Sequence, residues 1–176
     1  MNKQLFISKL IREREKLELL VNRIGFTRQL TMPGVLGKWS VKDVIAHLLA
    51  HEQYLADRLE EILHGEVYLP CKTQTALDAF LDEFGYPDFG SPLLDGDTPN
   101  EWVVDRYKNV SLEDVVTQEI NVFASIVSSL ETMSEDMIHK HNIYERVANG
   151  TYKHYNEHIH DIKKWFAVKA SNSKKS

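Results

Sequence analysis

Apolar residues recur at intervals of three and four along four long segments of this chain. Such intervals place the apolar side chains on one side of a helix, so each segment predicts an amphipathic helix with one buried face. The four faces consist of Phe6, Leu10, Leu17, Val21 and Ile24; Val41, Val44, Ile45, Leu48, Leu55, Leu59 and Ile62; Leu112, Val115, Val116, Phe123, Ile126, Val127 and Leu130; and Tyr155, Ile159, Ile162 and Phe166. The pattern predicts an all-α fold.

Capping residues indicate where these helices begin. Ser40 with Asp43, and Ser111 with Asp114, have the spacing of a capping box, in which side chain and backbone satisfy each other at the first turn. Thr151 follows a glycine and can cap the last helix. These signals predict that the second, third and fourth helices start after Ser40, Ser111 and Thr151.

Prolines and glycines interrupt the stretch from about residue 68 to 109, which predicts a long crossover between the second and third helices. A short helix over 75–84 is compatible with this stretch. Four helices with short outer connections and one long central connection predict a four-helix bundle. We expect residues 1–170 to form this single domain and residues 171–176 to be a disordered tail.

The composition excludes several classes of protein. The net charge is -5 and the basic residues are dispersed, so the electrostatic case for nucleic-acid binding is poor. No apolar run approaches the roughly 18 residues of a membrane-spanning helix. The lone Cys71 cannot form an internal disulfide, and the charged N-terminal residues do not resemble a signal peptide, so we expect a cytoplasmic protein.

Two histidine pairs at helical spacing are the strongest functional feature. His47 with His51 and His154 with His158 are each four residues apart, on a flank roughly 60 to 100 degrees from the centre of the apolar face. The two pairs could therefore face each other across a cleft, and an imidazole trio with an open position is a common catalytic metal site. Alternatively, the histidines only cover the core or bond to carbonyl groups.

Two glutamates fall within the predicted apolar faces and need partners there. Glu52 could act as a general base or orient a metal-ligating histidine, or it could pair with a nearby arginine or lysine. Glu119 has the same two interpretations. A lone loop cysteine such as Cys71 is usually without a catalytic role.

The segment WSVKDVIAHL, which contains His47, and the later HYxxH of His154 and His158 with its IKKW ending resemble the DinB-like superfamily. The chain is most similar to the branch related to ClbS and DfsB, over essentially its full length. The resemblance implies a four-helix bundle in which His47, His154 and His158 bind a divalent metal. His51 is outside this triad, which makes it a candidate for catalysis or substrate contact.

The resemblance also implies a function, because superfamily members include thiol-dependent transferases. We expect a metal-dependent enzyme that acts on a small molecule by thiol transfer or hydrolysis, in stress response or detoxification. Zinc or nickel is the favoured metal, and a low-molecular-weight thiol is a candidate co-substrate. The alternatives are a non-catalytic bundle that binds or sequesters a small molecule, and a bundle used mainly to form a homodimer.

Overall fold

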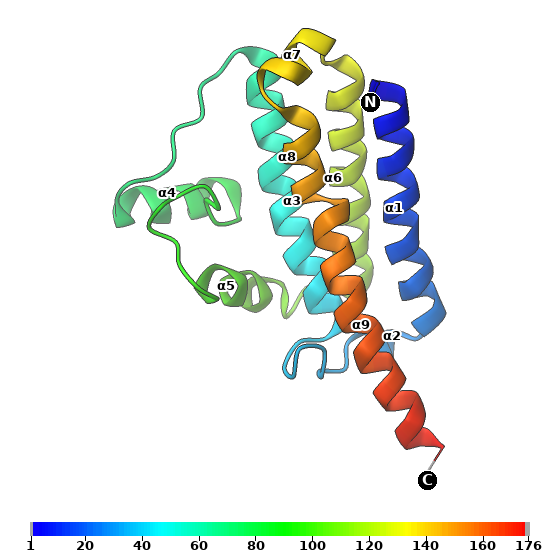
Figure 1. Ribbon diagram of the computed structural model, residues 1–176. Helices are drawn as coiled ribbons and strands as arrows, with labels where there is room; N and C mark the ends of the chain where they lie inside the picture. Colours follow the sequence, from blue (N-terminus) through cyan, green and yellow to red (C-terminus); the bar gives the residue numbers. More distant parts are fainter. Residues whose placement is uncertain (1, 175–176) are drawn as a thin grey trace.

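The computed structural model describes residues 2–174 and is a bundle of long helices (Figure 1). The long helices are α1 (Lys3–Ile24), α3 (Val41–His64), α6 (Leu112–Thr132) and α9 (Tyr152–Ser173). α1 and α9 run opposite to α3 and α6, so α3 and α6 are parallel neighbours that the crossover must connect. The predicted all-α bundle is confirmed. The connections contain α2 (Thr27–Leu30), α4 (Gln74–Phe84), α5 (Thr98–Tyr107), α7 (Glu135–Lys140) and α8 (Ile143–Gly150).

Local side-chain chemistry begins α3 and α6 where the sequence predicts. The Ser40 hydroxyl accepts from the Asp43 N–H at 3.1 Å, and the Asp43 carboxylate accepts from the Ser40 N–H at 2.8 Å, which completes the capping box. At α6 the Ser111 hydroxyl accepts from the Asp114 N–H at 3.0 Å. Here the Asp114 carboxylate accepts from the Ser111 hydroxyl instead of the backbone, so only half of the predicted box forms.

The last long helix, α9, starts at Tyr152, directly after Thr151 as predicted, but without the predicted side-chain cap. Thr151 caps nothing with its side chain, because its hydroxyl donates back to the carbonyl of Val147. The chain is already helical from Ile143, and α8 leads into α9 along the same side of the bundle (Figure 1). Ile143 and Val147 are four residues apart and fully buried, so the apolar face begins one helix earlier than we predicted.

The long crossover is confirmed, but it holds more structure than the sequence predicts. α4 corresponds to the short helix over 75–84, whereas α5 was not expected as a helix. At the C-terminus α9 continues through Ser173, so residues 171–173 of the expected tail are helical. Residues 175–176 of that tail lie outside the described residues.

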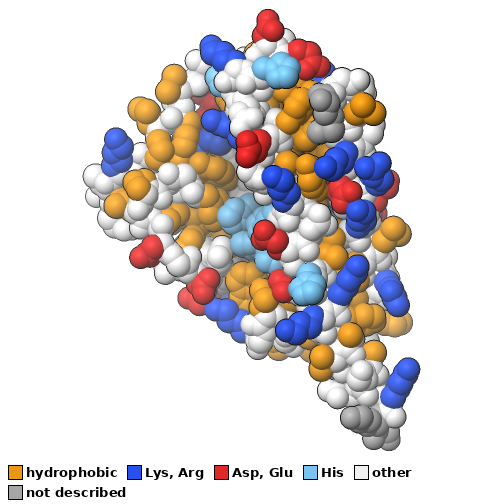
Figure 2. All heavy atoms as spheres, viewed as in Figure 1, with side chains coloured by type: hydrophobic (Ala, Val, Ile, Leu, Met, Phe, Trp, Pro, Cys, Tyr) orange, Lys and Arg blue, Asp and Glu red, His pale blue; other side chains and the backbone are white. Residues whose placement is uncertain are grey.

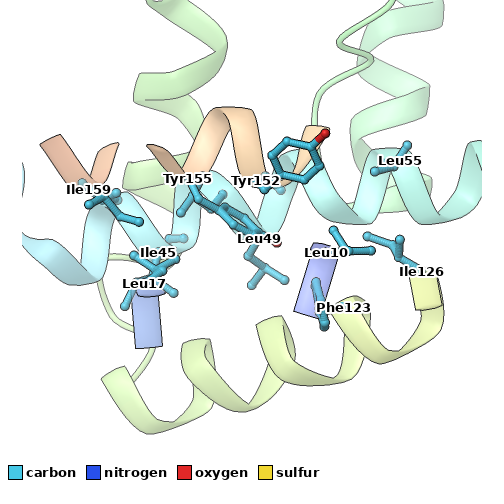
Figure 3. Close-up of a cluster of buried hydrophobic side chains, with 14 of the residues drawn as sticks. Leu10, Leu17, Ile45, Leu49, Leu55, Phe123, Ile126, Tyr152, Tyr155 and Ile159 are labelled. Carbon is cyan, nitrogen blue, oxygen red and sulfur yellow. The ribbon is translucent and has the colours of Figure 1, made fainter. Parts of the chain in front are cut away.

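All four long helices contribute to one core. Figure 3 shows Leu10 and Leu17 of α1 close to Ile45 and Leu49 of α3, with side chains of α6 and α9 around them. Tyr155 of α9 is among the largest side chains that are fully buried. This packing determines how α3 and α9 lie against each other, and these two helices carry the histidine pairs.

Polar contacts hold the crossover against α3. The Tyr86 hydroxyl donates to Asp57, and the Arg58 guanidinium carbon lies 4.2 Å from the centre of the Tyr68 ring. The buried Asp88 accepts from the hydroxyl of Tyr68 and, at 2.8 Å, from the backbone N–H of Cys71. These contacts bring the loop after Asp88 next to the histidines of α3.

Charged and polar residues are distributed along every long helix. As a result, none of the helices in residues 2–174 is both long enough and apolar enough to cross a lipid bilayer.

Candidate metal centre

The two histidine pairs meet between α3 and α9. Nε2 of His154 lies 2.9 Å from Nε2 of His47 and 3.1 Å from Nε2 of His158. The i, i+4 spacing puts both members of each pair on one side of their helix, and the core packing turns the two sides toward each other. Three ring nitrogens from two helices therefore converge on one point.

Hydrogen bonds among the rings alone cannot satisfy all three of these nitrogen atoms. A ring nitrogen has one in-plane position, filled by either a proton or a lone pair, so Nε2 of His154 can form one directed hydrogen bond. It has two close nitrogen neighbours, and one of these contacts must be unfavourable. Nitrogens bound tetrahedrally to one zinc ion at about 2.0–2.1 Å lie about 3.3–3.4 Å apart, so a shared cation would require the rings to separate by only a few tenths of an ångström.

Burial keeps these imidazoles in the neutral form that a metal requires. It lowers the pKa of His47 to about 2, an effect that the charges of the neighbouring histidines increase. Burial likewise lowers the pKa of His154 to about 3 and that of His51 to about 4, and it lowers the pKa of His158. At neutral pH the rings therefore offer lone pairs and do not repel a cation.

His51 belongs to the same cluster. Ligand atoms of His47, His51 and His154 all lie within 4.8 Å of one another, a grouping that could hold a metal ion. The His51 ring stacks on Phe89 with a centroid distance of 3.8 Å and an interplanar angle of 19°. The structure thus groups His51 with His47 and His154, whereas His158 joins them through its 3.1 Å contact with His154.

The other ring nitrogen, Nδ1, has no hydrogen-bond partner within the described residues in either His47 or His158. Nδ1 of His158 lies 3.7 Å from the Asp161 carboxylate, close to the acceptor that a ligating histidine usually has. Asn100 lies beside His47 and His51 in the wall of the same cavity, and its side chain counteracts the lowering of the pKa of both histidines. Sequence analysis missed Asn100, because a single asparagine in the crossover has no distinctive spacing.

The cluster opens into a cavity of about 440 Å³, which is within the usual range for small-molecule sites. His47, His51, His154 and His158 line it together with Phe89, Leu94, Asp95, Gly96, Pro99, Asn100 and Glu157. Figure 2 shows histidine side chains at the surface, next to a hydrophobic area that continues over the crossover. A small molecule can therefore reach the imidazoles from solvent.

Glu52 faces the bundle core and does not line this cavity. It is completely buried, and the hydroxyl of Tyr155 donates to one of its oxygens, while the other oxygen has no partner among residues 2–174. Burial raises its pKa well above the usual value, and the nearby charge of Glu119 raises it further. The contacts of Glu52 support neither a role beside a metal nor the arginine or lysine partner we considered, since its direct partner is a tyrosine.

Glu119 has the basic partner that we considered for it. Its carboxylate accepts two hydrogen bonds from Arg14 of α1, one of them from Nε at 3.0 Å. Cys71 lies in the crossover away from the histidine cavity, and burial raises the pKa of its thiol. Neither residue belongs to the histidine cluster.

Comparison with known proteins supports the fold. The chain is similar to a solved structure of an uncharacterised protein from Escherichia coli UTI89, with a TM-score of 0.72 and 15% identity. The alignment covers 97% of this chain and 94% of the other, so the likeness includes the crossover and the four bundle helices. No family profile and no curated protein matches the chain. The likeness concerns the architecture, and the chemistry of the site must be inferred from its residues.

Proposed function

We propose that this protein is a divalent-metal-dependent enzyme of the DinB-like superfamily that acts on a small molecule by hydrolysis or thiol transfer. The observation that carries the proposal is the position of Nε2 of His154, within 2.9 and 3.1 Å of two other imidazole nitrogens. Zinc and nickel suit a set of imidazole ligands, and we favour them over iron and copper. A role in detoxification or stress response is part of the proposal.

In this proposal His47, His154 and His158 hold the metal, as the family resemblance implies, and His51 stands beside them at the cavity. A divalent metal there would supply Lewis-acid chemistry toward a water molecule or a substrate sulfur. Asn100 lies close enough to His47 and His51 to help orient their rings, and Phe89 restrains His51 by stacking.

The proposal is tested by the metal content of protein purified without a histidine tag, measured by inductively coupled plasma mass spectrometry. We expect about one equivalent of a transition metal in the native chain and less than about a tenth of that in His158→Ala, because a three-histidine site loses most of its affinity with one ligand. His160→Ala is the matched control, since His160 lies on the same helix but is exposed and lines no part of the cavity.

A parallel His51→Ala sample distinguishes the two ligand sets. Loss of metal in His158→Ala alone supports the triad of the resemblance, whereas loss in His51→Ala as well extends the set to four. No metal in the native chain, even after reconstitution with zinc or nickel, would overturn the proposal. The protein would then be a non-catalytic bundle that holds a small molecule in the cavity.

A further inference from the structure

A second cavity, of about 460 Å³, lies beside the histidine cavity, between α4 and α5. The two cavities share Leu94, Asp95 and Pro99 in their walls, so they lie next to each other on the protein. One cavity holds the imidazoles, and the other reaches Leu77 of α4 and Trp102 of α5. A molecule that occupies both cavities would contact the metal centre and the crossover at once.

The cavity between α4 and α5 is largely apolar. Leu77, Leu81, Pro87, Leu93 and Trp102 line it, and Leu93 is 47% exposed. A half-exposed leucine beside an indole and other leucines, around a hollow open to solvent, gains from covering by an apolar group of a ligand. Hydrophobic side chains over the crossover next to the histidines are visible in Figure 2.

The charged residues in the walls have one sign. They are Asp78, Asp88, Asp95 and Glu157, and the described part of the chain contributes no lysine or arginine to either lining. Asp88 is buried and bonded to Tyr68 and Cys71, so its charge is used within the crossover.

The remaining acids are exposed at the mouth. Of these, Asp95 belongs to both cavities and stands where they meet. Arg106 lies with its guanidinium carbon 5.5 Å from the Trp102 ring centre, outside both linings. The acidic side chains around Asp95 therefore favour a cation over an anion at the mouth, whereas a divalent ion at the imidazoles would attract an anion at that end.

From this arrangement we infer that the substrate is a cationic amphiphile, with an apolar group in the cavity between α4 and α5 and a protonated amine beside Asp95. The inference rests on the proposed function, because it takes the histidine end as the reacting end.

The test uses three probes that differ only in charge: phenylbutylamine, phenylbutanol and phenylbutyrate. Isothermal titration calorimetry on the full chain as purified, with metal content measured on the same sample, gives their dissociation constants. We expect the amine to bind about tenfold more tightly than the alcohol, the gain of a charge-assisted bond to Asp95, and the carboxylate to bind more weakly than both.

Variants show which residues bind the charged and the apolar parts of the probes. Asp95→Asn should raise the dissociation constant of the amine about tenfold and leave that of the alcohol unchanged. Asp82→Asn, on an exposed residue of α4 outside both linings, should change neither. Trp102→Ala should weaken all three probes, and Leu81→Gln serves the same purpose if the tryptophan variant does not fold, as judged by circular dichroism.

Equal binding of amine and alcohol, an unchanged ratio in Asp95→Asn, or no binding of any probe would overturn the inference. Its failure is distinguishable from failure of the proposed function. Metal-containing protein that does not prefer the amine would retain the proposed function and lose the inference. Metal-free protein that prefers the amine would lose the proposed function and retain only the amine-binding site.

Discussion

Two consecutive residues of α3, His51 and Glu52, face different surroundings. Glu52 lies in the core, where Tyr155 donates to it and Arg14 pairs with the neighbouring Glu119. His51 lies in the histidine cluster, where ring nitrogens stand against other ring nitrogens. The glutamates of the core and the histidines of the cluster are both sets of buried polar side chains. The protein supplies most of the hydrogen-bond partners of the glutamates but few of those of the histidines. A set that lacks partners requires a ligand, which is why we assign function to the histidines and structure to the glutamates.

The largest loss of stability should follow from removing Arg14, which pairs with Glu119 in the core. Arg14→Ala leaves the buried carboxylate of Glu119 without its partner, and we expect the free energy of unfolding to fall by about 3 kcal/mol. Urea unfolding measures this, with Arg12→Ala, an exposed position of α1, as the control. Metal content should not change. The double variant Arg14→Met, Glu119→Leu should recover most of the loss, and a failure to recover would argue that the pair does more than neutralise charge.

In contrast to the Arg14–Glu119 pair, the histidine cluster should make the stability of the protein depend on metal. Zinc at about one hundred times its dissociation constant should raise the free energy of unfolding of the native chain by about 2.7 kcal/mol, because it binds the folded state. His154→Ala should lose this gain, since Nε2 of His154 contacts both other nitrogens. Thermal unfolding with and without zinc measures the effect, with His160→Ala as the control. An equal gain in His154→Ala would show that the ion binds elsewhere.

Tyr155→Phe tests whether the two sets are independent. Removing the hydroxyl leaves the buried Glu52 without its donor, and we expect a loss of about 2 kcal/mol in the free energy of unfolding. Metal stoichiometry, measured on the same preparation, should stay at the native value. Loss of metal in this variant would mean that the core contact sets the position of His154 and His158 on α9, and the distinction between the two sets would then fail.

The smallest effect concerns Asn100, a crossover residue beside His47 and His51 in the cavity wall. Asn100→Ala should weaken zinc binding about tenfold, as removal of a residue that orients a ligand commonly does. Competition with a chromogenic zinc chelator measures the affinity. Asn109→Ala, at an exposed position just after α5, should leave it unchanged. If both variants bind zinc like the native chain, the crossover contributes nothing to the metal centre.

Local signals explain which parts of the fold were predictable. Ser40 and Asp43 satisfy each other within one turn, and this contact forms wherever the helix lies. Gly150 and Thr151 mark the start of α9 correctly, but α8 before them was not predicted, although Ile143 and Val147 extend the buried apolar face. α5 was missed because the proline at its second position resembles a loop signal, yet proline is tolerated in the first turn of a helix.

The sequence by itself determined the bundle and the side of each helix on which the histidines lie, because both follow from the periodicity of one helix at a time. Only the tertiary structure decided that the ring nitrogens converge, that Glu52 meets Tyr155, and that Asn100 and Phe89 border the cavity. Those contacts join residues far apart along the chain, and their geometry depends on how α3, α9 and the crossover pack together. The periodicity of a single helix carries no information about that packing.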